Sequence, residues 1–283
     1  MGNSEKLKNI VKETYGNVVQ SENTSCCGSD SLSPEVYNIM TEDYSNVEGY
    51  NADADLSLGC GLPTQFAKIQ KGDTVIDLGS GAGNDSFIAR HEAGERGKVI
   101  GIDFTDAMIK KARTNAEKLG LNNVEFRQGD IEDMPVNDAV ADVIVSNCVL
   151  NLVPDKQKVI AEIYRTLKPG GHFSISDIVL VGELPEALKN DAEMYAGCVA
   201  GAIQKEEYMQ YIKDAGFNEI SIQKEKPIII PDNLLDRYLN TADKEKFKNG
   251  KTGIFSITVF AKKPGVKPSN EKTEGIPFKS SCC

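Results

Sequence analysis

The sequence has few of the side chains that exchange protons near neutral pH. Only two of its 283 residues are histidines, His91 and His172, and neither lies in a motif that could use a base. The N-terminus lacks the apolar run of a signal peptide, and no stretch approaches the roughly 18 apolar residues of a membrane span. We therefore expect a cytoplasmic protein with no membrane partner, whose chemistry makes little use of general-base catalysis.

The sequence also has no excess of positive charge. The formal net charge is −10. The densest basic run near the core, Lys110, Lys111 and Arg113, is explained by a solvated helix face. A nucleic acid would require a basic surface for its phosphates, so we expect no nucleic-acid partner. The hydrophobic content of 40% and the charged content of 26% are those of an ordinary globular protein.

The seven cysteines lack the arrangement of a structural zinc site or a disulfide framework. Structural zinc sites use close cysteine pairs, whereas Cys60, Cys148 and Cys198 stand alone among apolar residues. In a reducing cytosol such thiols are more often reactive or ligand-binding than paired in disulfides. Burial as small hydrophobic side chains is one interpretation of them. A site for a soft element is the other, because thiolates prefer soft, polarizable ions.

From Lys71 onward, short apolar runs alternate with amphipathic stretches. The apolar runs predict strands over residues 74–78, 98–102, 124–126, 142–145 and 173–178. The stretches between them predict helices over residues 85–92, from the N-cap Thr105 to Gly120, and from Pro154 at the first helical position to before Pro169. This order predicts an α/β fold with a doubly wound, mostly parallel sheet that is covered on both faces.

The two ends of the chain break this alternation. Residues 4–19 predict an amphipathic helix, and residues 21–33 a mobile loop. Past Asp177, residues 185–202 and 205–215 predict helices, and residues 220–222 and 254–260 predict strands. We interpret these last elements as the far edge of the same sheet, with a helical insertion that covers the active site. Residues 264–283 are rich in Lys, Pro, Ser and Gly and predict a disordered tail.

A glycine-rich loop, Asp77-Leu78-Gly79-Ser80-Gly81-Ala82-Gly83, follows the first predicted strand. Glycines between a strand and a helix let the backbone approach a bound ligand. Asn84 occupies the third glycine position of the dinucleotide fingerprint, which argues against a dinucleotide fold. Asp103 ends the second strand about 20 residues further on, where an acidic side chain accepts ribose hydroxyl protons. Gly129-Asp130-Ile131 follows the third strand.

Together with Leu167-Lys168-Pro169-Gly170-Gly171, these motifs resemble those of class I S-adenosylmethionine-dependent methyltransferases, which have a Rossmann-like fold. The resemblance implies S-adenosylmethionine as the methyl donor. It implies cofactor contacts from Asp77, Gly79, Ser80, Gly81, Gly83, Asp103, Met108, Asp130, Ile131 and Asn147. Asp77 either bonds the loop amides or approaches the methionine amino group, and Met108 either lines the adenine or packs in the core.

The contexts Leu-Gly-Cys60-Gly and Asn147-Cys148-Val-Leu-Asn-Leu resemble the arsenite methyltransferases, as does Cys198 among small residues. The resemblance covers roughly residues 8–262 and includes Tyr15-Gly16 and the Cys26-Cys27 pair. It implies that Cys60, Cys148 and Cys198 bind arsenic, and that Cys26 or Cys27 is an additional redox thiol. Cys282 and Cys283 lie outside the family's core pattern, so they either scavenge arsenite or belong to an incidental tail.

The expected organisation follows from both resemblances. Residues 1–58 form an N-terminal helix and cysteine-containing loop, 59–180 the cofactor-binding core, 181–263 the arsenic-binding part and 264–283 a flexible tail. The expected activity is methylation of trivalent arsenic to mono- and dimethylated products, for detoxification. The expected partners are arsenite or its thiol conjugates and a thiol reductant such as glutathione or thioredoxin, and we expect a monomer. The alternatives are a C- or O-methyltransferase of quinone-biosynthesis type and a non-catalytic arsenic-binding protein.

Overall fold

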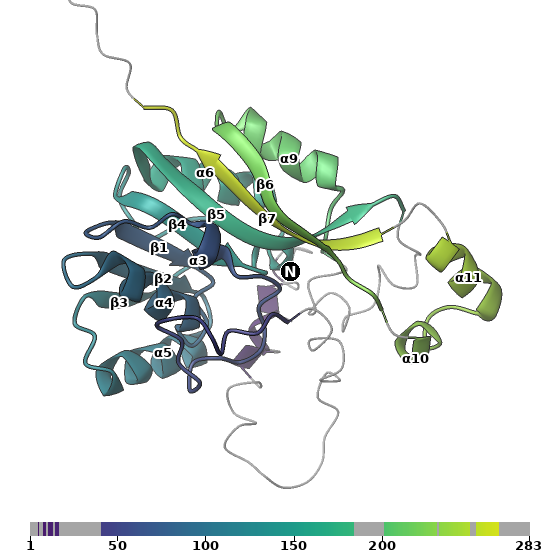
Figure 1. Cartoon of the computed structure of the whole chain (residues 1–283), viewed down its shortest axis with the longest axis horizontal. Coiled ribbons are helices and arrows are strands. Elements are labelled where there is room, and N and C mark those ends of the chain that lie inside the picture. Colours follow the sequence, from purple (N-terminus) through teal and green to yellow (C-terminus); the bar gives the residue numbers. More distant parts are fainter. Residues whose placement is uncertain are drawn as a thin grey trace, which may run out of the picture.

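A seven-stranded sheet forms the centre of the protein (Figure 1). The computed structural model describes residues 5, 8, 9, 11–13, 15, 16, 41–183, 201–230, 232–249 and 253–265. The strand order is β3-β2-β1-β4-β5-β7-β6. The strands are β1 (Thr74–Leu78), β2 (Lys98–Asp103), β3 (Val124–Gln128), β4 (Ala141–Asn147), β5 (Leu167–Val181), β6 (Asn218–Pro227) and β7 (Gly253–Lys262).

Helices cover both faces of the sheet. They are α3 (Pro63–Phe66), α4 (Asn84–Ala93), α5 (Asp106–Lys118), α6 (Lys156–Thr166), α9 (Lys205–Asp214), α10 (Asp232–Leu235) and α11 (Thr241–Asn249), with the 3-10 turn η1 (Leu150–Leu152). Successive residues of a strand point to opposite faces. Val75 of β1 accordingly packs in a cluster with Ala89 of α4. Ile76 packs in another cluster with Val159 of α6 and Ile212 of α9.

The predicted α/β class is confirmed, including the far edge of the sheet. Strands β1 to β5 pair in parallel, as the strand and helix alternation indicates. β7 then adds to β5 in the antiparallel sense, and β6 adds to β7. The arrangement places β1 between β2 and β4, so the chain reverses its direction of winding at β1. In open α/β sheets, ligands bind at such a reversal, beyond the carboxyl ends of the strands.

Two local predictions are wrong. Pro154 does not open α6, because Asp155 is its N-cap and accepts a hydrogen bond from the Lys158 amide. The loop predicted at Pro169-Gly170-Gly171 lies inside β5, which begins at Leu167. The pairing of β5 with β4 shifts register across this segment, and Gly170 has a positive φ of 84°. The glycines therefore accommodate a strand irregularity rather than separating helix from strand.

Other predictions lie partly or wholly outside the described residues. The described positions between 5 and 16 are helical, in agreement with the N-terminal helix. The segments 21–33, 185–200 and 266–283, with Cys26, Cys27, Cys198, Cys282 and Cys283, are not described. The four-part division of the chain therefore stays a prediction. None of the helices in the described ranges has the length and hydropathy that crossing a bilayer requires.

Candidate active site

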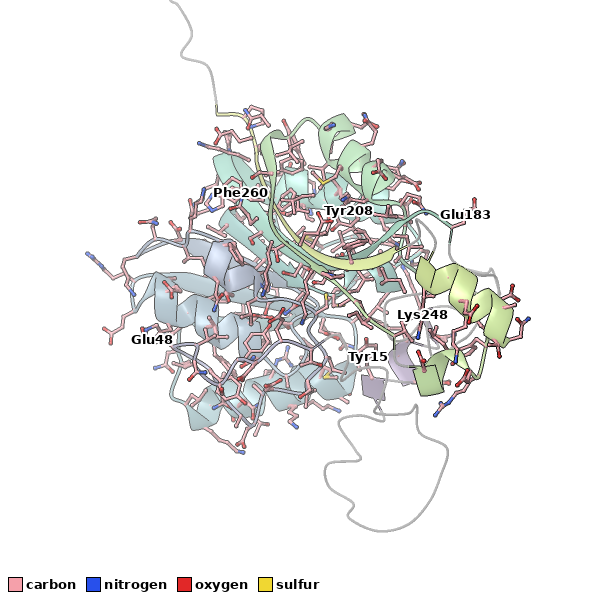
Figure 2. The ribbon with its side chains drawn as sticks, turned by 45° about the vertical axis from the view of Figure 1, so that its right-hand side comes forward. Tyr15, Glu48, Glu183, Tyr208, Lys248 and Phe260 are labelled. Atoms are coloured by element: carbon pink, nitrogen blue, oxygen red, sulfur yellow. The ribbon has the colours of Figure 1, made fainter. Side chains whose placement is uncertain are left out.

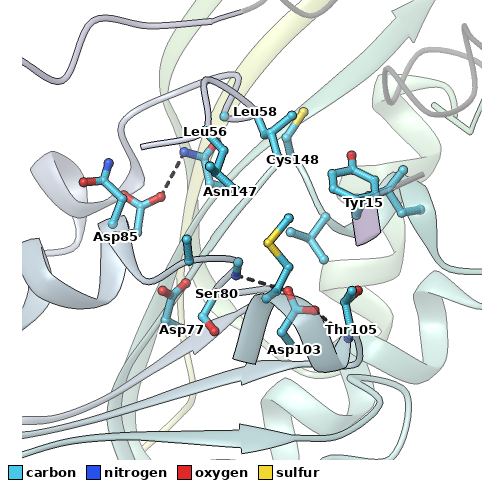
Figure 3. A pocket seen from close by; sticks show the side chains of 18 of the residues that line it. Tyr15, Leu56, Leu58, Asp77, Ser80, Asp85, Asp103, Thr105, Asn147 and Cys148 are labelled. Atoms are coloured by element: carbon cyan, nitrogen blue, oxygen red, sulfur yellow. Dashed lines mark hydrogen bonds between the residues drawn. The ribbon is translucent and has the colours of Figure 1, made fainter. Parts of the chain in front are cut away.

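A pocket opens at the carboxyl ends of β1, β2 and β4, where the winding reverses. The space within its lining, including open solvent at its mouth, is about 1090 Å³. Figure 3 shows Asp77, Ser80 and Asp103 along one side and Leu58, Asn147 and Cys148 along the other. Of the residues predicted to contact the cofactor, the pocket is lined by Asp77, Gly79, Ser80, Gly81, Asp103, Met108, Asp130, Ile131 and Asn147.

The glycine loop presents open backbone to this pocket. Gly79, Gly81 and Gly83 all have positive φ, of 66°, 51° and 103°. A Cβ added at Gly81 would meet nothing within 4 Å, so the loop leaves room for a ligand there. The hydroxyl of Ser80 is buried and has no hydrogen-bond partner among the described residues. An open backbone with an unpaired buried hydroxyl fits a polar ligand such as the methionine end of S-adenosylmethionine.

Gly83 does not line the pocket. A Cβ there would lie 2.8 Å from the ring of Phe87 and 2.9 Å from that of Phe126. The missing side chain therefore allows the loop to pack closely against α4 and β3, and the predicted contact of Gly83 with the cofactor stays a prediction.

Asp103 is held in place by two backbone amides. Its carboxylate accepts hydrogen bonds from the Gly81 amide at 3.1 Å and from the Thr105 amide at 2.8 Å. Burial raises the pKa of Asp103, although both amides favour the charged form. A carboxylate offers about four acceptor positions, and the Thr105 side chain also bonds to Asp103. The side chain therefore retains acceptor capacity for a hydroxyl of a bound ribose.

Asp77 is buried below the loop. Its carboxylate accepts a hydrogen bond of 2.6 Å from the Ser86 hydroxyl, in the first turn of α4. Burial, and then the neighbouring charge of Asp85, raise the pKa of Asp77 well above its usual value. The observed partner of Asp77 is thus a helix hydroxyl. Because Asp77 also lines the pocket, its approach to a ligand amino group stays a prediction.

The far end of the pocket combines an apolar wall with an ion pair. Met108 is 1% exposed and Ile131 is 5% exposed, and both line the pocket. Asp130 accepts a hydrogen bond of 2.5 Å from Lys8, which also pairs with Glu132. The N-terminal helix is therefore attached beside the predicted adenine site. Sequence reasoning missed Lys8, because nothing local marks it as a partner of Asp130.

The opposite end is organised around the Asn147 amide. Its Oδ1 accepts from the amides of Cys60 at 3.0 Å and Gly61 at 3.2 Å. Its Nδ2 donates to the Gly61 carbonyl at 2.8 Å and to Asp85 at 3.1 Å. A Cβ at Gly59 would lie 2.5 Å from this nitrogen. Asn147 therefore ties the segment that carries Cys60 to the end of β4.

Asp85 and Tyr44 complete this end of the pocket, and sequence reasoning missed both. The Tyr44 hydroxyl lies 3.0 Å from the Asp85 carboxylate and 3.0 Å from the Gly61 carbonyl, and can donate its single proton to either. Burial raises the pKa of Asp85 to about 6, against the stabilising hydrogen bonds from Asn147 and Tyr44. The position of Asp85 directly after the glycine loop could have identified it. Tyr44 carries no such local signal.

Cys60 and Cys148 lie together beside the pocket. Both are buried, at 0% and 4% exposure, and both belong to one apolar cluster with Val11, Leu152 and Ile178. Cys148 lines the pocket, whereas Cys60 lies behind Gly59, which does line it. Neither forms a disulfide within the described part of the chain. The same part contains no cluster of three His, Cys, Asp or Glu side chains that could hold a metal ion.

The known proteins to which this chain is similar are methyltransferases. The methyltransferase domain family matches residues 69–216. The arsenite methyltransferase of Halobacterium salinarum is 39% identical over 275 residues, which cover 92% of this chain and 67% of that protein. The arsenite methyltransferase of Aquipseudomonas alcaligenes is 33% identical and covers 82% of this chain and 68% of that protein. The crystal structure of an arsenic(III) S-adenosylmethionine methyltransferase from Chlamydomonas reinhardtii superposes with a TM-score of 0.62 at 29% identity, covering 82% of this chain and 74% of that one.

Proposed function

Because this chain belongs to the S-adenosylmethionine-dependent arsenite methyltransferases, we propose that it methylates trivalent arsenic bound by the thiolates of Cys60, Cys148 and Cys198. The observation that carries this proposal is the burial of Cys60 and Cys148 in one cluster at the edge of the pocket. Two thiols 88 positions apart in the chain would not meet there unless the fold brought them together. Cys198 enters the proposal from the sequence resemblance alone.

The proposed cofactor contacts follow the two ends of the pocket. S-adenosylmethionine is the methyl donor of this family, and it supplies an electrophilic sulfonium methyl group when bound. Gly79, Ser80 and Gly81 would hold its methionine portion, and Asp103 its ribose hydroxyls. Asn147 lines the pocket directly before Cys148, which supports placing the transferred methyl at this end. At the other end the adenine would lie against Met108, Asp130 and Ile131.

Arsenic is the substrate in this proposal. Trivalent arsenic with three thiolate ligands is a trigonal pyramid whose lone pair points away from the sulfurs. Thiols fixed on rigid elements would orient that lone pair toward the methyl group, which turns an encounter into an oriented displacement. An arsenic–carbon bond forms as the methyl–sulfonium bond breaks. No proton is removed from the nucleophile, in keeping with the scarcity of histidine.

The product of this step carries pentavalent arsenic, and a second methylation requires its reduction. Closure of two thiols into a disulfide supplies two electrons. We assign this role to Cys26 or Cys27 together with an arsenic-binding thiol, and the regeneration of the thiols to glutathione or thioredoxin. Repetition of the cycle would give mono- and then dimethylated arsenic, which suits a role in detoxification.

The experiment is to incubate the protein with arsenite, glutathione and S-adenosylmethionine and to separate the arsenic species by chromatography with mass-spectrometric detection. The proposal predicts methylated arsenicals, and none when S-adenosylmethionine is omitted. A parallel incubation with a demethylated quinol tests the alternative substrate. Methylation of the quinol with no methylation of arsenite would reverse the assignment.

A further inference from the structure

Cys148 has an unusual backbone conformation. Its φ is 60°, in the left-handed region that residues other than glycine rarely adopt. Such a conformation is strained and persists only when the surroundings enforce it. Cys148 immediately follows β4, and its amide donates to the carbonyl of Ser176 in β5 at 2.8 Å. The left-handed residue therefore turns the chain out of the sheet at the edge of the pocket.

Asn151 fastens this turn to the same strand. Its Nδ2 donates to the carbonyl of Ile178 at 2.6 Å, two residues along β5 from the partner of Cys148. The Asn151 side chain has no solvent exposure, so this bond is shielded from water. The turn from Cys148 to Asn151 is thus held to β5 at both of its ends.

Stability alone does not explain an asparagine at this position. The Oδ1 of Asn151 is buried and has no hydrogen-bond partner among the described residues. A buried acceptor without a partner destabilises the folded state, and a leucine of similar size would avoid this penalty. The residue lies in the Asn-Cys-Val-Leu-Asn-Leu motif, yet it does not line the pocket. Its distinctive contact is the hydrogen bond from its Nδ2 to the Ile178 carbonyl of β5.

A second polar contact braces the strand at the same place. Asp177 lies between Ser176 and Ile178, and it accepts a hydrogen bond of 3.2 Å from the Tyr208 hydroxyl of α9. Tyr208 is 1% exposed and lies inside the molecule between α9 and the sheet (Figure 2). The hydrogen bond between Tyr208 and Asp177 therefore braces the part of β5 to which the turn is attached.

We propose that Asn151 is a positioning residue for the thiol of Cys148: its bond to β5 keeps Cys148 in the left-handed conformation and so fixes the direction of the sulfur. This inference rests on the proposed function for its consequence in catalysis. Its structural part, that Asn151 controls the backbone conformation of Cys148, does not depend on arsenic binding.

The test compares Asn151→Leu with wild type and with Thr64→Val. Thr64 is a matched control, because its hydroxyl is also buried without a partner in the described residues but lies in α3, away from the pocket lining. The direct readout is the alkylation rate of each cysteine with iodoacetamide, followed by peptide mass spectrometry. Release of the strained turn should raise the rate at Cys148 by about fivefold or more, the factor that about 1 kcal/mol provides. Cys60 should change less than about twofold, because its carbonyl is bound independently by the Ser256 hydroxyl at 2.6 Å.

Two further readouts separate positioning from general damage. The affinity for S-adenosylmethionine should stay within about twofold of wild type, while kcat/KM for arsenite should fall about tenfold, equivalent to about 1.4 kcal/mol. If Asn151→Leu does not fold, Asn151→Ser provides the same comparison, because serine is too short to reach Ile178. Alkylation of Cys148 at the wild-type rate in a folded variant would overturn the proposal. If wild type failed to methylate arsenite, the proposed function would fall, and the alkylation rates would still decide the role of Asn151.

Discussion

The two ends of the pocket are built differently. The cofactor end uses segments that follow one another in the chain: the loop after β1, Asp103 at the end of β2 and Asp130 after β3. The thiol end joins distant segments, because the Asn147 side chain binds the Cys60 amide across 87 positions. The first end is lined by carboxylates from successive segments, whereas at the second an apolar cluster holds two thiols beside the hydrogen-bonded side chains of Asn147, Asp85 and Tyr44. The predicted cofactor site is thus combined with the thiol site that we propose for arsenic.

The largest expected effect comes from removing the thiol that lines the pocket. Cys148→Ser should abolish methylation of every arsenical, because Cys148 and Cys198 form the proposed minimal arsenic site and one of them alone cannot fix the direction of the arsenic lone pair. Its affinity for S-adenosylmethionine, measured by calorimetry, should stay close to wild type. Cys198→Ser should behave in the same way. Residual methylation at more than a few per cent of the wild-type rate would contradict the assignment of arsenic binding to the thiol end.

The cofactor end responds to a different substitution. Asp103→Ala removes the acceptor that the Gly81 and Thr105 amides orient. We expect a loss of about 1–3 kcal/mol in the binding free energy of S-adenosylmethionine, the usual cost of leaving polar groups unpaired. Equilibrium binding of arsenite should be unchanged. Wild-type cofactor affinity in this variant would exclude Asp103 as the ribose acceptor.

Cys60 should have a narrower effect than Cys148. It lies behind Gly59 and does not line the pocket directly. We expect Cys60→Ser to lose methylation of arsenite but to retain that of monomethylarsenite, which has one methyl group already and needs only two thiols. Rates with the two substrates, measured on the same preparation, provide the check. An equal loss of rate with both substrates would contradict the separate roles proposed for Cys60 and Cys148.

The smallest expected effect concerns stability and pH. Burial raises the pKa of Asp177 to about 7, although the charge of Lys156 and the hydrogen bond from Tyr208 oppose the shift. The folded state therefore holds this proton more tightly than the unfolded state, whose pKa is near 3.8. The stabilising contribution is complete below about pH 4 and is lost as the pH rises through about 7.

The asparagine side chain in Asp177→Asn cannot ionise, so this variant should not lose the stability that wild type loses as the pH rises. The difference in unfolding free energy between the variant and wild type should shift in favour of the variant between about pH 4 and pH 8. Denaturant titrations at several pH values measure it. A pH-independent difference for Asp177→Asn would mean that this carboxyl does not change its protonation in that range.

The contrast between the two ends also explains what could be predicted from sequence. The order of β1 to β5 and the cofactor-end residues follow from local patterns, since a glycine loop and an acidic strand end are each read within a few positions. The bond of Asn147 to Cys60, the ion pair of Lys8 with Asp130 and the role of Tyr44 depend on contacts across the chain. The left-handed φ of Cys148 has no signal in its residue type, because only glycine would mark such a position. The helices α3, α10 and α11 were also missed, because α3 and α10 have only four residues each and α11 has too few apolar residues to show a periodic face.

The central claim is that Cys60 and Cys148 act as ligands of one arsenic atom beside the cofactor pocket. X-ray absorption at the arsenic edge tests it most directly, on protein loaded with one equivalent of arsenite. The account predicts an all-sulfur first shell in wild type, which loses one sulfur and gains one oxygen in Cys60→Ser. An oxygen-only shell in wild type, or an all-sulfur shell that is unchanged when both Cys60 and Cys148 are replaced by serine, would contradict it.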